Sequence, residues 1–220
     1  MAIAALEVLQ ADADSELIKD GIGKFLKERS DVREIARLDL TEAVAISRLD
    51  KLQERFGAAI DKMAKQKKSK RTISFSEAGR DVVAAVLRDL LDLGASLYRP
   101  FHIEELHEMR IAAKRLRYAI ELFTACWGEA IAPFGGEIAE MQSFLGEVHD
   151  CDVWIDSLGE RLERERDSAA TDEGDYQTAA WLLSEFVKKR TKEYRSALRL
   201  WSEWEANHFA DRMQSTILAA

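Results

Sequence analysis

Four basic side chains near the middle of the sequence repeat at helical spacing, a pattern suited to binding anions. His107, Arg110, Lys114 and Arg117 are separated by steps of three, four and three residues. Because each helical residue turns by about 100°, the four would share a stripe roughly 80° wide that borders the apolar face. Arginine presents a planar donor fork that matches phosphate oxygens, and lysine adds a point charge. The row therefore predicts a linear site for an extended phosphate polymer.

Two neighbouring features qualify this stripe. Arg115 points about 80° away from His107, so it would lie at the edge of the site. Glu121 lies close to the stripe and Glu104 somewhat further round, and cations packed on one helix repel one another without a counter-charge. The spacing alone therefore leaves open a surface stripe that is neutralised by acids.

A second basic row follows near the end of the sequence. Lys188, Lys192, Arg195 and Arg199 step by four, three and four residues, which places them within about 60° on one helix. The row would form the opposite wall of a groove that faces the first stripe. It is equally compatible with an exposed basic face, since Glu193 lies on the same helix.

A third group of cations, from Lys62 to Arg71, contains no acid and is of a different kind. Positive charge favours a helix C-terminus, so the segment reads as a solvated helix end followed by a loop. The alternative is a mobile arm that wraps a polyanion.

The elements that position these residues are helices, because apolar residues recur at three- and four-residue steps and period-two alternation is nearly absent. Ser74 and Glu77 have the spacing of a capping box, and Pro100 breaks the chain before the motif helix. The fold class is all-α, an antiparallel bundle of long helices. The expected helices run over about 15–29, 31–66, 74–98, 103–125, 133–167 and from 175 past 201.

Composition limits the function classes. The chain has 220 residues and a net charge of −8, so any polyanion site must be a local concentration of positive charge. No apolar run approaches the roughly 20 residues of a membrane span, and the first residues lack the basic start of a secretory signal. Cys126 and Cys151 have no disulfide-framework or zinc spacing. We expect a cytoplasmic protein without a membrane partner.

The stretch His107-x2-Arg110-x3-Lys114-Arg115-x-Arg117-Tyr118 resembles the motif helix of CHAD domains, the conserved-histidine α-helical domains. The later stretch from Phe144 to Val153, with Leu145-Gly146 followed by His149 and Asp150, resembles the second signature of that family. The resemblance implies a helical bundle of two similar halves that binds inorganic polyphosphate in a basic groove and is not a catalyst. It implies a single domain over 1–220, with a diverged half at 1–100 and a motif-bearing half at 101–220.

Two departures from the family accompany the resemblance. Only one copy of the motif helix is legible, and the candidate for the other copy carries cations but no His and no close Arg pair. His149 fills the basic position of the second signature, where its charge depends on pH. The candidate cations of the first half are Arg33, Arg37, Arg48, Lys51 and Arg55.

The expected site combines the two basic rows with the signature residues. Tyr118, Asp150 and Asp152 would support it, the two acids either by capping a helix or by orienting nearby Arg and His side chains. No cofactor or metal is expected. The expected polyphosphate ligands are His107, Arg110, Lys114, Arg115, Arg117, His149, Lys188, Lys192, Arg195 and Arg199.

Three other functions remain open from the sequence. A di-iron site would use Glu104-x2-His107 and Glu205-x2-His208, although Glu104 and His107 fall off the apolar face. A phosphotransfer protein would use His107 as the phosphoryl acceptor. The third is a helical scaffold that has no anion ligand or that binds nucleic acid. Nucleic-acid binding is disfavoured because the aromatic residues recur at core spacing. A homo-oligomer is compatible with the sequence, and no catalytic nucleophile with a base, Gly-rich phosphate loop or HExxH motif indicates an enzyme.

Overall fold

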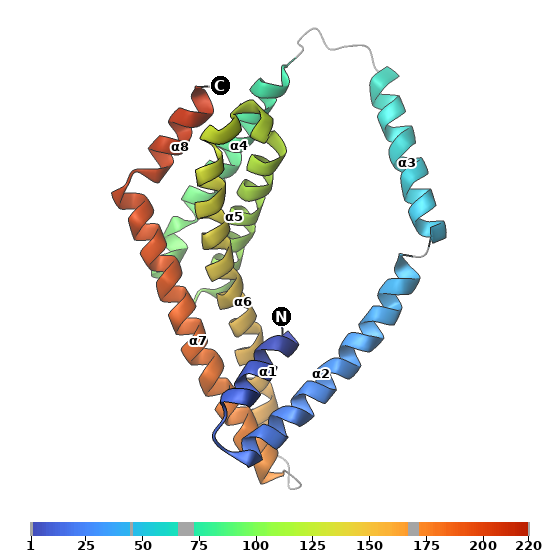
Figure 1. The fold of residues 1–220 in the computed structure, drawn as a ribbon, viewed down its shortest axis with the longest axis vertical. Helices are drawn as coiled ribbons and strands as arrows, with labels where there is room; N and C mark the ends of the chain where they lie inside the picture. The colour runs from blue at the N-terminus through green and yellow to red at the C-terminus, as the bar shows by residue number, and fades with distance from the viewer. Residues whose placement is uncertain (1, 45, 66–72, 167–171, 220) are drawn as a thin grey trace. The chain divides into compact units, whose positions relative to one another are not determined.

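The computed structural model describes residues 2–44, 46–65, 73–166 and 172–219 (Figure 1). These residues form helices and no strand, which confirms the all-α class. None of the described helices combines the length and the apolar character that crossing a membrane requires. The elements are α1 (Ala2–Asp12), α2 (Glu16–Ala43), α3 (Ile46–Lys65), α4 (Phe75–Asp92), η1 (Gly94–Tyr98), α5 (Ile103–Phe123), η2 (Thr124–Cys126), η3 (Gly128–Ala130), α6 (Ala132–Arg166), α7 (Glu173–Ala206) and α8 (Phe209–Leu218).

The helices divide into two compact units. Unit 1 comprises Met1–Thr72 together with Asp172–Thr178, and unit 2 comprises Ile73–Thr171 and Ala179–Ala220. The division near residue 72 does not coincide with the boundary at residue 100 that the family resemblance implies. All residues of the two predicted basic rows, and the second signature, belong to unit 2.

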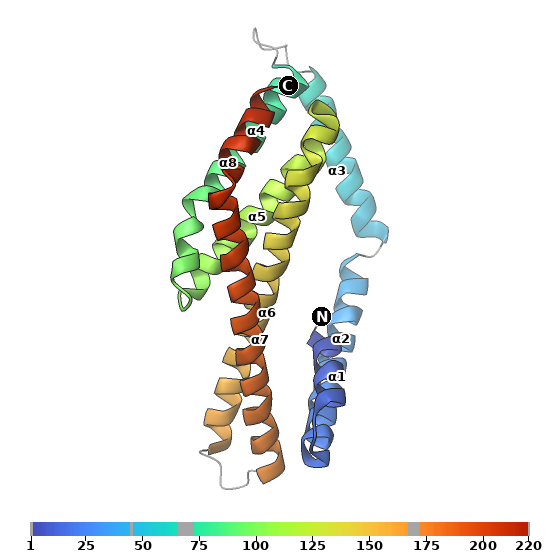
Figure 2. The ribbon, with the colours of Figure 1, turned by 60° about the vertical axis from the view of Figure 1, so that its left-hand side comes forward.

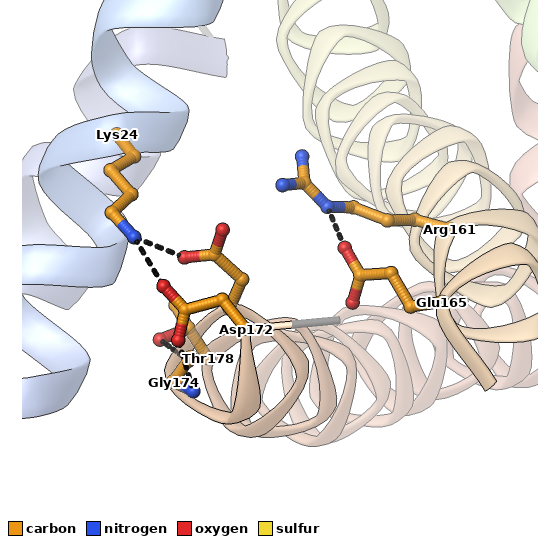
Figure 3. A network of polar contacts seen from close by, with 7 residues as sticks. Lys24, Arg161, Glu165, Asp172, Gly174 and Thr178 are labelled. Carbon is orange, nitrogen blue, oxygen red and sulfur yellow. Dashed lines mark hydrogen bonds and ion pairs between the residues drawn. The ribbon is translucent and has the colours of Figure 1, made fainter. Parts of the chain in front are cut away.

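Unit 1 is built on a hairpin of α1 and α2. Leu6, Ile22 and Phe25 are buried in it. Gly21 allows α2 to approach the start of α7, because a Cβ there would lie only 2.0 Å from Thr178 Oγ1. The exposed Lys24 of α2 contacts the same segment, since its Nζ lies 2.6 Å from Asp175 Oδ1 and 3.1 Å from Asp172 Oδ2 (Figure 3).

The sequence prediction differs from the structure at three places in unit 1. α1 was not expected, and α2 continues through Ser30 and Asp31, where the prediction ends one helix and begins another. The single helix predicted over 31–66 is divided in the structure, since α2 ends at Ala43 and α3 begins at Ile46. Serine is common at the N-cap of helices, but Ser30 lies within a continuous helix of 28 residues. Gln66 to Arg71 of the basic run lie outside the described residues.

Unit 2 contains a hydrophobic core to which α4, α5, α6, α7 and α8 contribute. α5 packs against α4 and α6, and α8 returns to pack on α4 (Figure 2). The predicted capping box is confirmed, because the Glu77 backbone N–H donates to Ser74 Oγ and the Ser74 backbone N–H donates to Glu77 Oε2. The predicted apolar face of α5 is also confirmed by burial: its members are Leu106, Met109, Ala113, Leu116, Ile120 and Phe123.

Aromatic rings fill the end of this core near α8. Trp204 stacks on Phe209 with ring centroids 4.1 Å apart, and Trp201 lies 5.7 Å from Trp204. Gly94 contacts this cluster so closely that an added Cβ would lie 2.2 Å from Trp201 Cζ2. The indole therefore leaves space only for a glycine at position 94.

We predict that Gly94→Ala destabilises unit 2 by roughly 1–3 kcal/mol, because a methyl group would overpack the buried Trp201 ring. Urea unfolding followed by tryptophan fluorescence measures the change. Gly136→Ala is the matched control, since nothing lies within 4 Å of a Cβ at that helical position. The control should retain or gain stability by about 0.5–1 kcal/mol; equal stability of the two variants would contradict the proposed packing.

Candidate functional site

The first predicted basic row lies on α5 at the border of the core. His107, Arg110, Lys114 and Arg117 are all half-buried, whereas Arg115 is exposed. This arrangement follows from the helical register, because the row flanks the apolar arc that packs against α4 and α6. The four side chains are therefore partly desolvated by the same packing that stabilises the helix.

α6 brings a second imidazole to this row. The rings of His107 and His149 lie with their centroids 4.3 Å apart and their planes tilted by 40°. Arg110 lies over the same surface of α6, since a Cβ on Gly146 would be 3.7 Å from Arg110 Nε. We call His107, Arg110 and His149 the α5–α6 basic cluster.

Each member of the α5–α6 basic cluster has a buried nitrogen that lacks a hydrogen-bond partner within the described residues. These atoms are His107 Nδ1, Arg110 Nε and His149 Nδ1. A buried polar atom without a partner costs about 1–3 kcal/mol, so such atoms are rare and call for an explanation. Arg110 Nε–H is always a donor and needs an acceptor.

The electrostatics of the α5–α6 basic cluster also bear on whether an anion would be stabilised there. Burial lowers the pKa of His149 below its usual value of 6.5, and the positive charges of His107 and Arg110 lower it further. Asp150 and Asp152 oppose this shift but do not overcome it. An imidazole whose protonation is disfavoured by neighbouring cations lies at a place where an anion would be stabilised.

Arg117 is already engaged by protein groups. Its Nε donates to Gln142 Oε1 at 2.8 Å, and its Nη1 lies 2.6 Å from Glu121 Oε1. The guanidinium group also lies 4.6 Å from the ring of Tyr118, which is exposed. The acid-neutralised alternative therefore applies to Arg117, while Lys114 has no ion pair with any described residue.

The second predicted row does not face this cluster. Lys188, Lys192, Arg195 and Arg199 are exposed on the side of α7 roughly opposite the side that packs on α6. Lys188 pairs with Glu185 at 2.6 Å. The helical register explains the difference, because the apolar residues of α7 turn the row outward, and its role in binding stays a prediction.

Two other cations of α7, which the sequence analysis missed, contact α6 instead. Lys189 Nζ lies 2.7 Å from Glu147 Oε2. Arg190 forms an ion pair with the buried Asp152, and its Nη2 donates to the Pro100 carbonyl at 2.7 Å. The signal available in the sequence was Asp152 itself, since an acid on the buried side of a helix requires a counter-charge.

Of the two roles predicted for the signature acids, the structure excludes helix capping, and the pair of Asp152 with Arg190 agrees with the orienting role. Asp150 and Asp152 lie inside α6, so neither caps a helix. Asp152 orients Arg190, which holds the segment just before α5, while Tyr194 Oη donates to the Leu97 carbonyl in the preceding η1 turn. Asp152 thus positions the start of the motif helix and does not bond directly to the basic cluster.

The di-iron alternative finds no supporting geometry. Glu104 is exposed, and Glu205 accepts hydrogen bonds from Tyr98 Oη at 3.3 Å and Trp201 Nε1 at 2.9 Å. Within the described ranges, no three His, Cys, Asp or Glu side chains are grouped as metal ligands. The two cysteines are free thiols, and burial raises the pKa of Cys151 to about 11, so Cys151 is a protonated core side chain at neutral pH.

We predict that Asp152→Ala costs roughly 3–5 kcal/mol in the free energy of unfolding, because it leaves the Arg190 guanidinium buried without a counter-charge. Lys188→Ala is the control, since it breaks the solvent-accessible ion pair with Glu185 on α7, the helix that carries Arg190, and should cost less than about 1 kcal/mol. Chemical denaturation measures both. A small loss for Asp152→Ala would show that the pair does not hold the start of α5.

The comparisons with known proteins agree with the motif analysis. No curated protein and no solved structure matches the chain. The family model of the CHAD domain matches residues 2–159, which is more than half of the 220 residues and includes both α5 and the second signature. The chain therefore belongs to the CHAD domain family.

Proposed function

We propose that this chain binds inorganic polyphosphate through the α5–α6 basic cluster, with Lys114 extending the site along α5. The observation that carries the proposal is the set of three buried basic nitrogens, from two helices, that lack partners among the described residues. A phosphate oxygen would accept from Arg110 Nε–H and compensate for its desolvation. Membership of the CHAD family supports a role related to polyphosphate.

A polymer suits this site better than a single phosphate. Lys114 lies one turn beyond Arg110, about 6 Å further along the axis, so the positive charge continues in one direction. Exposed Arg115 adds a cation at the edge of this track. Successive phosphates of one chain would therefore meet successive cations, and the affinity would depend on several contacts together.

We propose binding without catalysis. The nearest alternative is phosphotransfer through His107, which needs an accessible ring nitrogen and room for a docking protein. His107 Nδ1 is buried and the ring packs on His149, so this imidazole is restricted on one side. Such packing favours recognition of an anion over acceptance of a phosphoryl group.

We predict that Arg110→Ala and Lys114→Ala each lower the affinity for long-chain polyphosphate by about tenfold or more, because each removes a charge-assisted contact. Isothermal titration calorimetry of the full chain measures the affinity, with orthophosphate and RNA as competitors. The matched control is Arg88→Ala with Arg164→Ala, two exposed cations of unit 2 outside the site. A loss in the control equal to that in the site variants would indicate nonspecific charge attraction and contradict the proposal.

The exposed row on α7 gives a separate test. Because Lys192, Arg195 and Arg199 form no ion pair with described residues, they are available to a polyanion. Their outward orientation predicts that Arg195→Ala with Arg199→Ala changes the affinity by less than about threefold at physiological salt, where exposed charges are screened. A loss as large as that of Arg110→Ala would make the row a second wall of the site.

A further inference from the structure

The two imidazoles of the α5–α6 basic cluster form an arrangement that responds to protons. We infer that His107 and His149 couple anion binding to proton uptake, so that the site holds a phosphate chain more tightly at mildly acidic pH than at neutral pH. This inference rests on the proposed function, because it concerns the regulation of the same site. It depends on ring geometry, burial and the charges that surround the pair.

The rings of His107 and His149 are in contact. With centroids 4.3 Å apart, two protonated imidazoles would place two positive charges side by side, next to the Arg110 guanidinium group. Partial burial weakens the screening of this repulsion by water. Without an anion, the doubly protonated cluster is therefore disfavoured.

Charged side chains of α5 and α6 surround His149. α5 contributes His107 and Arg110, which disfavour protonation, and α6 contributes Asp150 and Asp152, which favour it. The carboxylate of Asp152 is already paired with Arg190 of α7. Lys189 of α7 is likewise paired, with Glu147 of α6, so both α7 cations that contact α6 here are compensated by acids of α6.

These charges determine the direction in which anion binding and protonation of His149 are linked. Burial and the two cations lower the pKa of His149 in the free chain, so at neutral pH its imidazole is neutral. A bound phosphate chain adds negative charge and favours the protonated form, so binding takes up a proton. As the pH falls below the pKa of the imidazole in the complex, the affinity rises. The affinity levels off once the pH is below the pKa of the imidazole in the free chain. The slope between these limits reaches about tenfold per pH unit for each coupled imidazole.

The chain contains internal controls for this inference. His102 is exposed, and its Nδ1 lies 3.0 Å from Glu105 Oε1, outside the cluster. His208 is exposed in the junction between α7 and α8, where its Nδ1 lies 3.7 Å from Asp211 Oδ2. These two imidazoles complete the set of four histidines in the sequence.

The experiment is calorimetric titration of the full chain with long-chain polyphosphate between about pH 5.5 and pH 8, where imidazoles titrate. Two buffers with different ionisation enthalpies report the number of protons taken up. Long chains are used because their few terminal phosphates contribute little titration. We expect the wild type and His102→Gln to lose affinity by about tenfold or more toward high pH. His149→Gln should show a flatter profile and reduced proton uptake.

The outcomes separate the inference from the proposed function. Wild-type binding that neither changes with pH nor takes up protons overturns the inference and leaves the proposed function standing. Absence of binding at every pH, with the chain folded, overturns both. A pH dependence that persists unchanged in His149→Gln and His107→Gln also overturns the assignment to this pair.

A second measurement covers the case in which a histidine variant does not fold. Proton NMR follows the imidazole Hε1 signals of the wild-type chain across the same pH range, with and without long-chain polyphosphate. We expect two of the four histidines to titrate at higher pH in the complex, with the exposed pair nearly unchanged. Equal titration of all four signals in both states would overturn the inference.

Discussion

The structure depends on the packing of one arc of α5 against α4 and α6. The residues that fill this arc, such as Met109 and Leu116, are apolar and fully buried, so the register of the helix is fixed by the core. Basic side chains at the border of the arc are then necessarily half-buried. Desolvation of His107 and Arg110 is thus a consequence of helix packing, and a bound anion would compensate for it, as the proposed function requires.

A separate interaction holds the end of this helix. The buried pair of Asp152 and Arg190 connects α6 to α7, and Arg190 reaches the Pro100 carbonyl just before α5 begins. The chain turns at Pro100, where the His102 backbone N–H donates to the Arg99 carbonyl, and Arg190 ties this turn to α6 and α7. The second signature therefore has two tasks in this chain: His149 contributes to the basic cluster, while Asp152 fixes the segment that precedes the motif helix. The proposed phosphate site and its scaffold are built from neighbouring residues of one helix.

Periodicity was enough to predict the parts of the structure that a single helix determines. The buried face of α5 follows from the spacing of Leu106 to Phe123, and the start of α4 follows from Ser74 and Glu77. Contacts between helices were harder, because they depend on how each helix is rotated about its axis. The α7 row was legible as a stripe, but only packing shows that Lys189 and Arg190, and not Lys188 and Lys192, turn toward α6. His149 became a candidate through the signature, since nothing in its local spacing indicates that its ring meets His107.

The account is tested most directly by the Nε–H signal of Arg110, a buried donor without an acceptor among the described residues. The full chain is labelled with ¹⁵N-arginine, and its Nε–H resonances are followed by NMR during titration with long-chain polyphosphate. Arg110→Lys identifies the signal of interest. We predict that this signal shifts downfield and exchanges more slowly with water, because a phosphate oxygen accepts the bond. A titration that moves other arginine signals and leaves that of Arg110 unchanged would contradict the account.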